Sequence, residues 1–230
     1  MSGARSESTP SRPSNSAYDG FFSLPVELRH TIYKEVLAVQ HPLFLFQDPG
    51  CPIETFLPER PRQWLALLYT NRKVSIEARA VLYGTNEFVL EDVSQRQGSL
   101  LDSFLTCIGP LNAGFLSRLR VNFPIIESID DTSGDIRLRE DGLQILRLLQ
   151  DKCTNLKILE TLVYGQVSRL ITEKDISNHS FRSVLLDIDT QFKAIASLNK
   201  IVVRFCSGPP AASTTEFMKQ LGWIVLLGNR

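Results

Sequence analysis

The chain has 230 residues, of which 43% are hydrophobic and 22% are charged, and its 25 Lys and Arg balance 25 Asp and Glu. This length fits one large domain, or a small module joined to a medium one, with a core that needs no disulfides. The zero net charge lacks the basic excess typical of nucleic-acid or anionic-membrane binding, and no apolar run approaches the ~18 residues of a membrane-spanning helix, so neither partner is expected.

Residues 1–20 are rich in serine and almost free of apolar side chains. They lack the hydrophobic stretch of a secretory signal, which favours a cytoplasmic or nuclear location. They also offer too little apolar surface to offset the entropy lost on ordering. We therefore expect a disordered tail over 1–20.

The first ordered element is predicted to be a helix that begins near Pro25 and ends near Ala38. Proline fits the first turn of a helix, where its missing N–H would have no partner. Apolar residues recur every three to four positions and form a stripe. The stripe consists of Leu28, Ile32, Val36 and Val39, and Leu24 lies on the same stripe at the start of the helix. Tyr33 and Leu37 widen this apolar arc, so the helix could serve a core and a partner at once.

The stretch 40–61 holds five of the twelve prolines and cannot be a continuous helix. Within it, Leu43–Phe46 is predicted to be a short strand. Helical periodicity then returns and ends near Gly84, which is placed to form a left-handed C-terminal cap. The alternation at Phe88–Leu90 predicts a second strand that pairs with Leu43–Phe46.

Three segments of the second half follow one template, with apolar residues or threonine at the first, fourth, sixth and eighth positions. They are Leu116–Phe123, Leu156–Val163 and Leu198–Phe205. An amphipathic helical stretch precedes each one. These stretches are Leu100–Ile108, Gly142–Lys152 and Phe181–Ser197. A fourth, degenerate unit covers Thr214–Leu227.

Repeated helix–strand units favour strands that pair in parallel through helical crossovers, as in leucine-rich repeats. An ordinary open α/β sheet would show the same alternation. We predict a mixed α/β fold with three parts: the tail (1–20), a helical module with a short β-hairpin (21–92), and three or four helix–strand units with a parallel sheet (93–230).

No motif for catalysis, cofactor binding or metal binding is visible. The three histidines lack ligand spacing, and no cysteine pair has the spacing of a zinc site, so buried free thiols are expected. Asp187 and Asp189 resemble a metal-binding pair but lie in a helical pattern, which favours a solvated helix face. We expect no catalytic residue, cofactor or metal, and no enzyme; a site assembled from loops is the alternative.

The strongest motif lies in the N-terminal half. It begins Phe22-x-Leu24-Pro25-x-Glu27-Leu28-x-x-x-Ile32-Tyr33-x-x-Val36-Leu37. It continues Leu67-Leu68-x-Thr70-x-Arg72-x-Val74-x-x-Glu77-Ala78-x-x-Val81-Leu82-Tyr83-Gly84-x-Asn86-x-Phe88. In order and spacing, residues 21–125 resemble F-box-like fungal proteins of uncharacterised function.

The resemblance implies a protein–protein interaction protein, namely a substrate-recognition subunit of a cullin–RING ubiquitin ligase. Its first helix would dock on a Skp-type adaptor protein, and its repeat half would bind an unidentified client protein. The partner-binding residues would be Leu24, Pro25, Glu27, Leu28, Ile32 and Val36. The same residues could instead pack only within the chain, which would leave a non-catalytic scaffold protein without a ligase role.

Overall fold

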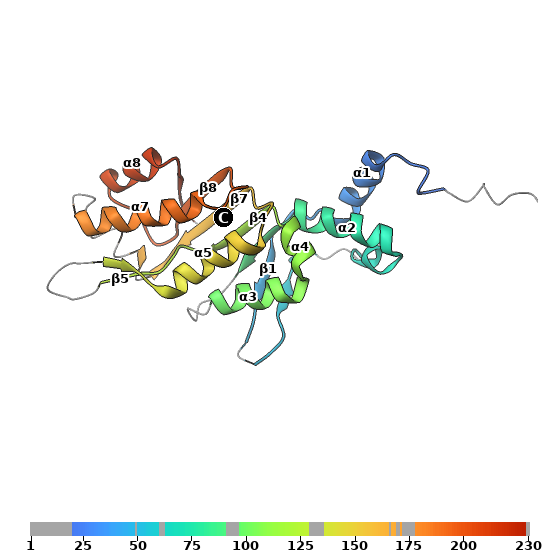
Figure 1. The fold of residues 1–230 in the computed structure, drawn as a ribbon, viewed down its shortest axis with the longest axis horizontal. Coiled ribbons are helices and arrows are strands. Elements are labelled where there is room, and N and C mark those ends of the chain that lie inside the picture. The colour runs from blue at the N-terminus through green and yellow to red at the C-terminus, as the bar shows by residue number, and fades with distance from the viewer. Residues whose placement is uncertain are drawn as a thin grey trace, which may run out of the picture.

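The computed structural model describes residues 20–48, 50–59, 63–90, 97–128, 136–165, 167–168, 171 and 178–228. The predicted tail, except for Gly20, lies outside these ranges. The fold is mixed α/β, as predicted, and is built on a seven-stranded sheet in the order β2-β1-β3-β4-β7-β8-β9 (Figure 1). The strands run parallel except for β2, which is antiparallel to β1.

Helices and strands alternate along most of the chain. The helices are α1 (Val26–Leu37), the 3-10 helix η1 (Ala66–Tyr69), α2 (Arg72–Thr85), α3 (Gln97–Ile108), α4 (Pro110–Phe115), α5 (Glu140–Lys152), α7 (His179–Lys193) and α8 (Ala212–Gln220). The strands of the large sheet are β1 (Leu43–Phe46), β2 (Glu54–Phe56), β3 (Glu87–Leu90), β4 (Arg118–Asn122), β7 (Ile158–Val163), β8 (Lys200–Phe205) and β9 (Ile224–Leu227). A separate antiparallel pair joins β5 (Ile126–Ser128) to β6 (Ile136–Leu138).

The two strands predicted in the N-terminal half do pair, but in parallel. Leu43 of β1 lies opposite Phe88 of β3, and the chain returns between them through α2, which is the connection that parallel strands require. The hairpin of this half joins β1 to β2 instead, with Phe44 opposite Phe56. The predicted pairing of these two strands is therefore confirmed, and the second strand of the hairpin is β2, from the proline-rich stretch.

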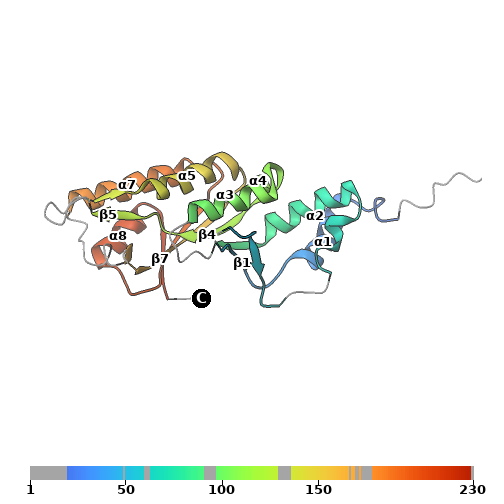
Figure 2. The ribbon, with the colours of Figure 1, turned by 90° about the horizontal axis from the view of Figure 1, so that it is seen from below.

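The helix–strand repeat is confirmed at the level of its elements. Leu119, Leu159 and Ile201, the fourth residues of the three templates, lie side by side on β4, β7 and β8. The degenerate fourth unit supplies α8 and β9, with Val225 opposite Val203. Leu119, Leu159 and Val203 belong to one buried core under the helices, and Figure 2 shows α3, α5 and α7 along one face of the sheet.

Two predicted helix ends were wrong. Gly84 lies inside α2 and is no cap, because α2 continues to Thr85 and is capped by Asn86. The helix α7 ends at Lys193, before the predicted Ser197, because the residues after it form the turn into β8.

The predicted boundary between residues 92 and 93 lies outside the described ranges. On either side of it, β3 and β4 are neighbours in one sheet, with Phe88 opposite Leu119. The two predicted parts therefore share a continuous β-structure. In the described part of the chain, no helix combines the length and apolarity needed to cross a bilayer.

The cysteines are all free, but the prediction of buried thiols holds for only part of them. Burial raises the pKa of the Cys153 thiol to about 12, and Cys206 is half-buried. Cys51 and Cys107 are exposed, because Cys51 lies in the turn between β1 and β2 and Cys107 lies on the outer side of α3.

Asp187 is exposed, as expected of a solvated helix face, but Asp189 is buried. Its carboxylate accepts a hydrogen bond of 2.9 Å from the indole N–H of Trp223 and pairs with Lys193 at 2.6 Å. Trp223 precedes β9 and packs edge-on against Phe192 of α7. The solvated prediction for Asp189 was wrong because its partner comes from a distant part of the sequence.

Candidate functional site

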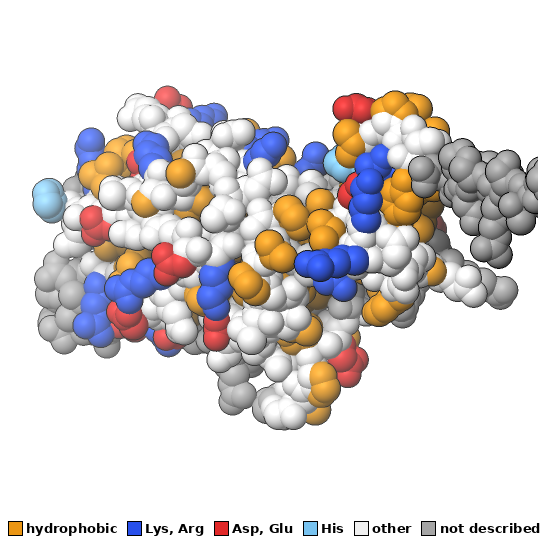
Figure 3. Space-filling view, turned by 45° about the vertical axis from the view of Figure 1, so that its right-hand side comes forward, with side chains coloured by type: hydrophobic (Ala, Val, Ile, Leu, Met, Phe, Trp, Pro, Cys, Tyr) orange, Lys and Arg blue, Asp and Glu red, His pale blue; other side chains and the backbone are white. Residues whose placement is uncertain are grey.

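The helix α1 has two neighbouring faces with different surroundings. Arg29, Tyr33 and Leu37 form the buried face. Leu28, Ile32 and Val36, each one position earlier, are 51%, 41% and 39% exposed. We call these three residues the outward stripe. Figure 3 shows hydrophobic side chains gathered at this end of the molecule.

The other predicted partner-binding residues flank the outward stripe. Leu24 is half-buried, and Pro25 is exposed at the position immediately before α1. Glu27 is exposed in the first turn, where a carboxylate interacts favourably with the helix dipole. The structure thus places all six predicted residues on one helix and the turn that leads into it.

An ion pair between buried Arg29 and half-buried Glu77 fixes α1 to α2 near the start of α1. The Arg29 guanidinium donates two hydrogen bonds to the Glu77 carboxylate, of 2.9 and 2.7 Å, and a third to the backbone carbonyl of Leu24. The Tyr33 hydroxyl donates to the same carboxylate at 3.0 Å. The hydrogen bonds from Arg29 hold the pKa of Glu77 below its ordinary value. Glu77 therefore stays ionised at neutral pH and keeps α1 in place.

Asn86, at the end of α2, fixes the other end of α1. Its amide nitrogen donates to the carbonyls of Leu37 and Leu82, both at 2.9 Å, and its amide oxygen accepts from the Val39 N–H at 2.8 Å. Both ends of α1 are thereby bonded to α2. The outward stripe is held in one orientation, which reduces the ordering that a partner would have to impose.

The segment before α1 extends the apolar surface. The Phe21 ring packs against Tyr33, with centroids 5.7 Å apart. The Phe22 ring is partly exposed and lies under the ammonium of Lys73 at 4.7 Å. Such cation–π contacts orient an aromatic side chain without burying it. Phe22 therefore adds a fixed aromatic group at the start of the outward stripe.

The side of the sheet that faces away from α3, α5 and α7 carries a row of charges that was not predicted from the sequence. Along β3, β4, β7 and β8, alternate residues point away from the helices. On this side the Arg120 guanidinium lies 2.5 Å from the Glu87 carboxylate and 3.4 Å from the Glu160 carboxylate, measured from nitrogen to oxygen. The Arg204 guanidinium lies 2.6 Å from the same Glu160 carboxylate. We call these four residues the charge ladder. Arg120, Glu160 and Arg204 are more than nine-tenths buried.

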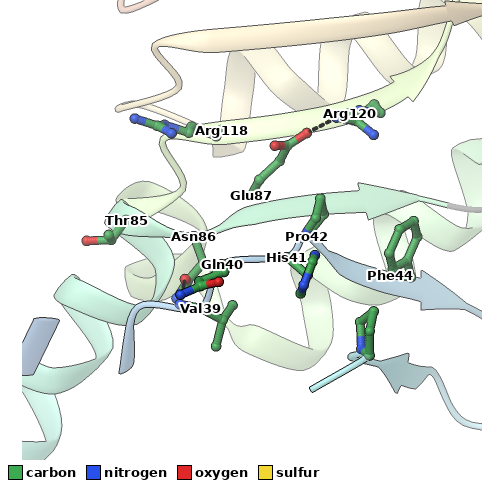
Figure 4. Close-up of a pocket in the computed structure, with 11 residues that line it drawn as sticks. Val39, Gln40, His41, Pro42, Phe44, Thr85, Asn86, Glu87, Arg118 and Arg120 are labelled. Carbon is green, nitrogen blue, oxygen red and sulfur yellow. Dashed lines mark hydrogen bonds and ion pairs between the residues drawn. The ribbon is translucent and has the colours of Figure 1, made fainter. Parts of the chain in front are cut away.

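A pocket of about 390 Å³ opens where β1, β3 and β4 begin, at one end of the charge ladder (Figure 4). Its walls combine apolar and basic side chains with amide and hydroxyl groups. They are formed by Val39, Gln40, His41, Pro42, Phe44, Pro58, Thr85, Asn86, Glu87, Arg118 and Arg120. Within the described ranges, no three His, Cys, Asp or Glu side chains are placed to hold a metal ion.

The molecule thus has two candidate surfaces, the outward stripe at one end and the pocket at the end of the charge ladder. The first was predicted from the sequence, and the second was not. Comparison of the chain with protein-family models, with curated proteins and with solved structures found no match.

Proposed function

We propose that this chain is a protein–protein interaction protein whose outward stripe docks in an apolar groove of a Skp-type adaptor. It would thereby act as a substrate-recognition subunit of a cullin–RING ubiquitin ligase, with the repeat half binding the client. The observation that supports this most is the exposure of Leu28, Ile32 and Val36 on a helix whose other face is buried. The choice of a Skp-type adaptor as the partner comes from the resemblance of residues 21–125 to F-box-like proteins.

The outward stripe has the properties of a helix that binds in a groove. Three apolar side chains recur at every fourth position, which is the spacing of the anchor residues in such complexes. These side chains are about half exposed, and burying the exposed half of one of them would contribute roughly 1 kcal/mol. The bonds from Glu77 and Asn86 hold the helix in place, so little of this energy would be spent on ordering.

The double substitution Leu28→Asp, Ile32→Asp tests the proposal. We expect at least about a 100-fold loss of affinity for the purified adaptor, because two apolar anchors become charged at the centre of the interface. The free energy of unfolding should change by less than about 1 kcal/mol, because both residues are exposed. Calorimetry with the adaptor and urea denaturation of the variant measure the two quantities.

Leu186→Asp is the matched control, because Leu186 is an exposed leucine on α7, away from α1. It should leave adaptor binding unchanged. If the wild-type protein does not bind the adaptor, the ligase role is wrong. If the double variant unfolds, the stripe belongs to the core and the scaffold alternative is favoured.

A further inference from the structure

We propose that the pocket at the start of β1, β3 and β4 binds a peptide segment that carries an oxyanion, either a carboxylate or a phosphate, beside an apolar side chain. The inference rests on the proposed function in one respect only, in that the bound segment would belong to the client. It does not depend on the adaptor.

On this side of β4, β7 and β8, the two carboxylates of the charge ladder leave two cations over, Arg118 at the pocket and Lys200 two strands away on β8. Arg118, Arg120 and Arg204 supply three guanidinium groups, and the carboxylates of the charge ladder supply two negative charges. Glu87 is paired with Arg120, and Glu160 is shared by Arg120 and Arg204. In the part of the chain that the structure describes, Arg118 has no ion pair, although it is exposed and lines the pocket.

Figure 4 shows how this arrangement arises. Glu87 lies opposite Arg118 in the register of β3 and β4, yet its carboxylate reaches toward Arg120. The Arg118 guanidinium is therefore left free at the pocket. A planar guanidinium with unused N–H groups is suited to bind a carboxylate or phosphate through two parallel hydrogen bonds.

A second cation, Arg120, lies in the wall of the pocket and is held by ion pairs of imperfect hydrogen-bond geometry. The Nε and Nη2 atoms of Arg120 lie within ion-pair distance of the two carboxylates, but neither forms a hydrogen bond, although the side chain is more than nine-tenths buried. Buried donors without hydrogen bonds are costly. Arg120 therefore adds positive charge behind the wall of the pocket, and Arg118 is the guanidinium that a ligand oxyanion can reach.

The remaining walls favour a peptide over a polyanion such as nucleic acid. Phe44 lines the pocket, and its ring lies 6.4 Å from that of Phe56 on β2, which is 55% exposed. Phe46 continues the same side of β1 and is also exposed. An aromatic strip thus leads away from the basic end of the pocket. An anionic group followed by an apolar side chain matches this order of surfaces.

Fluorescence anisotropy with labelled peptides tests the proposal on the full chain, without the adaptor. Three short peptides would be compared, each with a phenylalanine beside two variable positions. Both variable positions are glutamate in the first peptide, phosphoserine in the second and glutamine in the third. We expect the glutamate or the phosphoserine peptide to bind at least about tenfold more tightly than the glutamine peptide, because a hydrogen bond between charged groups is lost in the last. The tighter of the two anionic peptides identifies the group that the pocket prefers.

Arg118→Gln should abolish most of that preference, and Arg118→Lys should restore part of it, because lysine keeps the charge without the planar donor geometry. Lys200→Gln is the control, because Lys200 is also an exposed cation on the charge-ladder side, two strands away on β8. Equal affinity for the three peptides, or an equal effect of the two glutamine variants, would overturn the inference. So would a short single-stranded RNA that displaces the anionic peptides. None of these outcomes bears on adaptor binding, which the variants of α1 test separately.

Discussion

Replacing Glu160 with leucine is expected to lower the free energy of unfolding by about 3–5 kcal/mol, because it leaves two buried guanidinium groups without their shared carboxylate. Arg204 loses an ion pair of 2.6 Å, and Arg120 keeps only Glu87. Urea denaturation followed by circular dichroism measures the change without screening the charges. Among the described ion pairs, the Glu160 cluster is more deeply buried than the surface pairs, and its effect should be correspondingly larger.

Two further variants show whether charge burial is the cause. Arg147→Gln breaks an exposed pair with Glu140 and should change the free energy of unfolding by less than about 1 kcal/mol. The triple variant Arg120→Met, Glu160→Leu, Arg204→Met should regain most of the stability lost in Glu160→Leu, because apolar replacement of buried charges that neutralise one another is often neutral. Only Glu87, which is partly exposed, loses its partner. A Glu160→Leu variant as stable as Arg147→Gln would show that the ladder does not stabilise the sheet.

The second large effect is expected at Tyr33. This side chain is fully buried between α1 and α2, and Tyr33→Ala should cost about 3–5 kcal/mol by opening a cavity there. Tyr33→Phe removes only the hydrogen bond to Glu77 and should cost about 1 kcal/mol. The contrast with Leu28→Asp, Ile32→Asp, on the neighbouring face of the same helix, separates packing from docking.

Alkaline pH offers an independent readout of the Tyr33 hydroxyl. Burial, followed by the hydrogen bond to Glu77, raises its pKa from 10.0 to about 12. The unfolded chain therefore loses this proton first, and the stability that the neutral hydroxyl contributes is complete below pH 10 and declines between pH 10 and about 12. Denaturation curves across this range should show that decline in the wild type and a smaller one in Tyr33→Phe. Identical curves would contradict the buried position of the hydroxyl.

The repeat half could be predicted from the sequence because its signal is local. In each unit the apolar alternation of one strand follows the stripe of one helix, and the template places Leu119, Leu159 and Ile201 at equivalent positions, which the sheet brings side by side. Apolar residues that recur with the period of a strand or a helix mark the buried face of that element in almost any tertiary context.

The charge ladder could not be predicted in the same way. In the sequence, Arg120 alternates with the apolar residues Leu119 and Val121, which is typical of the outward face of a half-buried strand. Its partners Glu87 and Glu160 lie on other strands, far away in the sequence. The strand order and register that bring them together depend on the whole sheet. The available signal was weak: Arg120 and Glu160 occupy the same position of two templates, with opposite charge.

The two faces of α1 show the same limit. Leu28, Ile32 and Val36 have the apolar character of core residues, whereas Arg29 does not, yet Arg29 is buried and the other three are exposed. Periodicity identified the apolar arc but not the stripe that packs. That choice is made by Glu77 on α2, whose carboxylate binds both Arg29 and Tyr33.

Methyl NMR of the chain with added Skp-type adaptor tests the docking surface most directly. The proposal predicts that the methyl signals of Leu28, Ile32 and Val36 shift or broaden as the adaptor binds, while those of Leu186 stay unchanged. An adaptor that leaves all of these signals in place, or that moves only methyl groups far from α1, would contradict it.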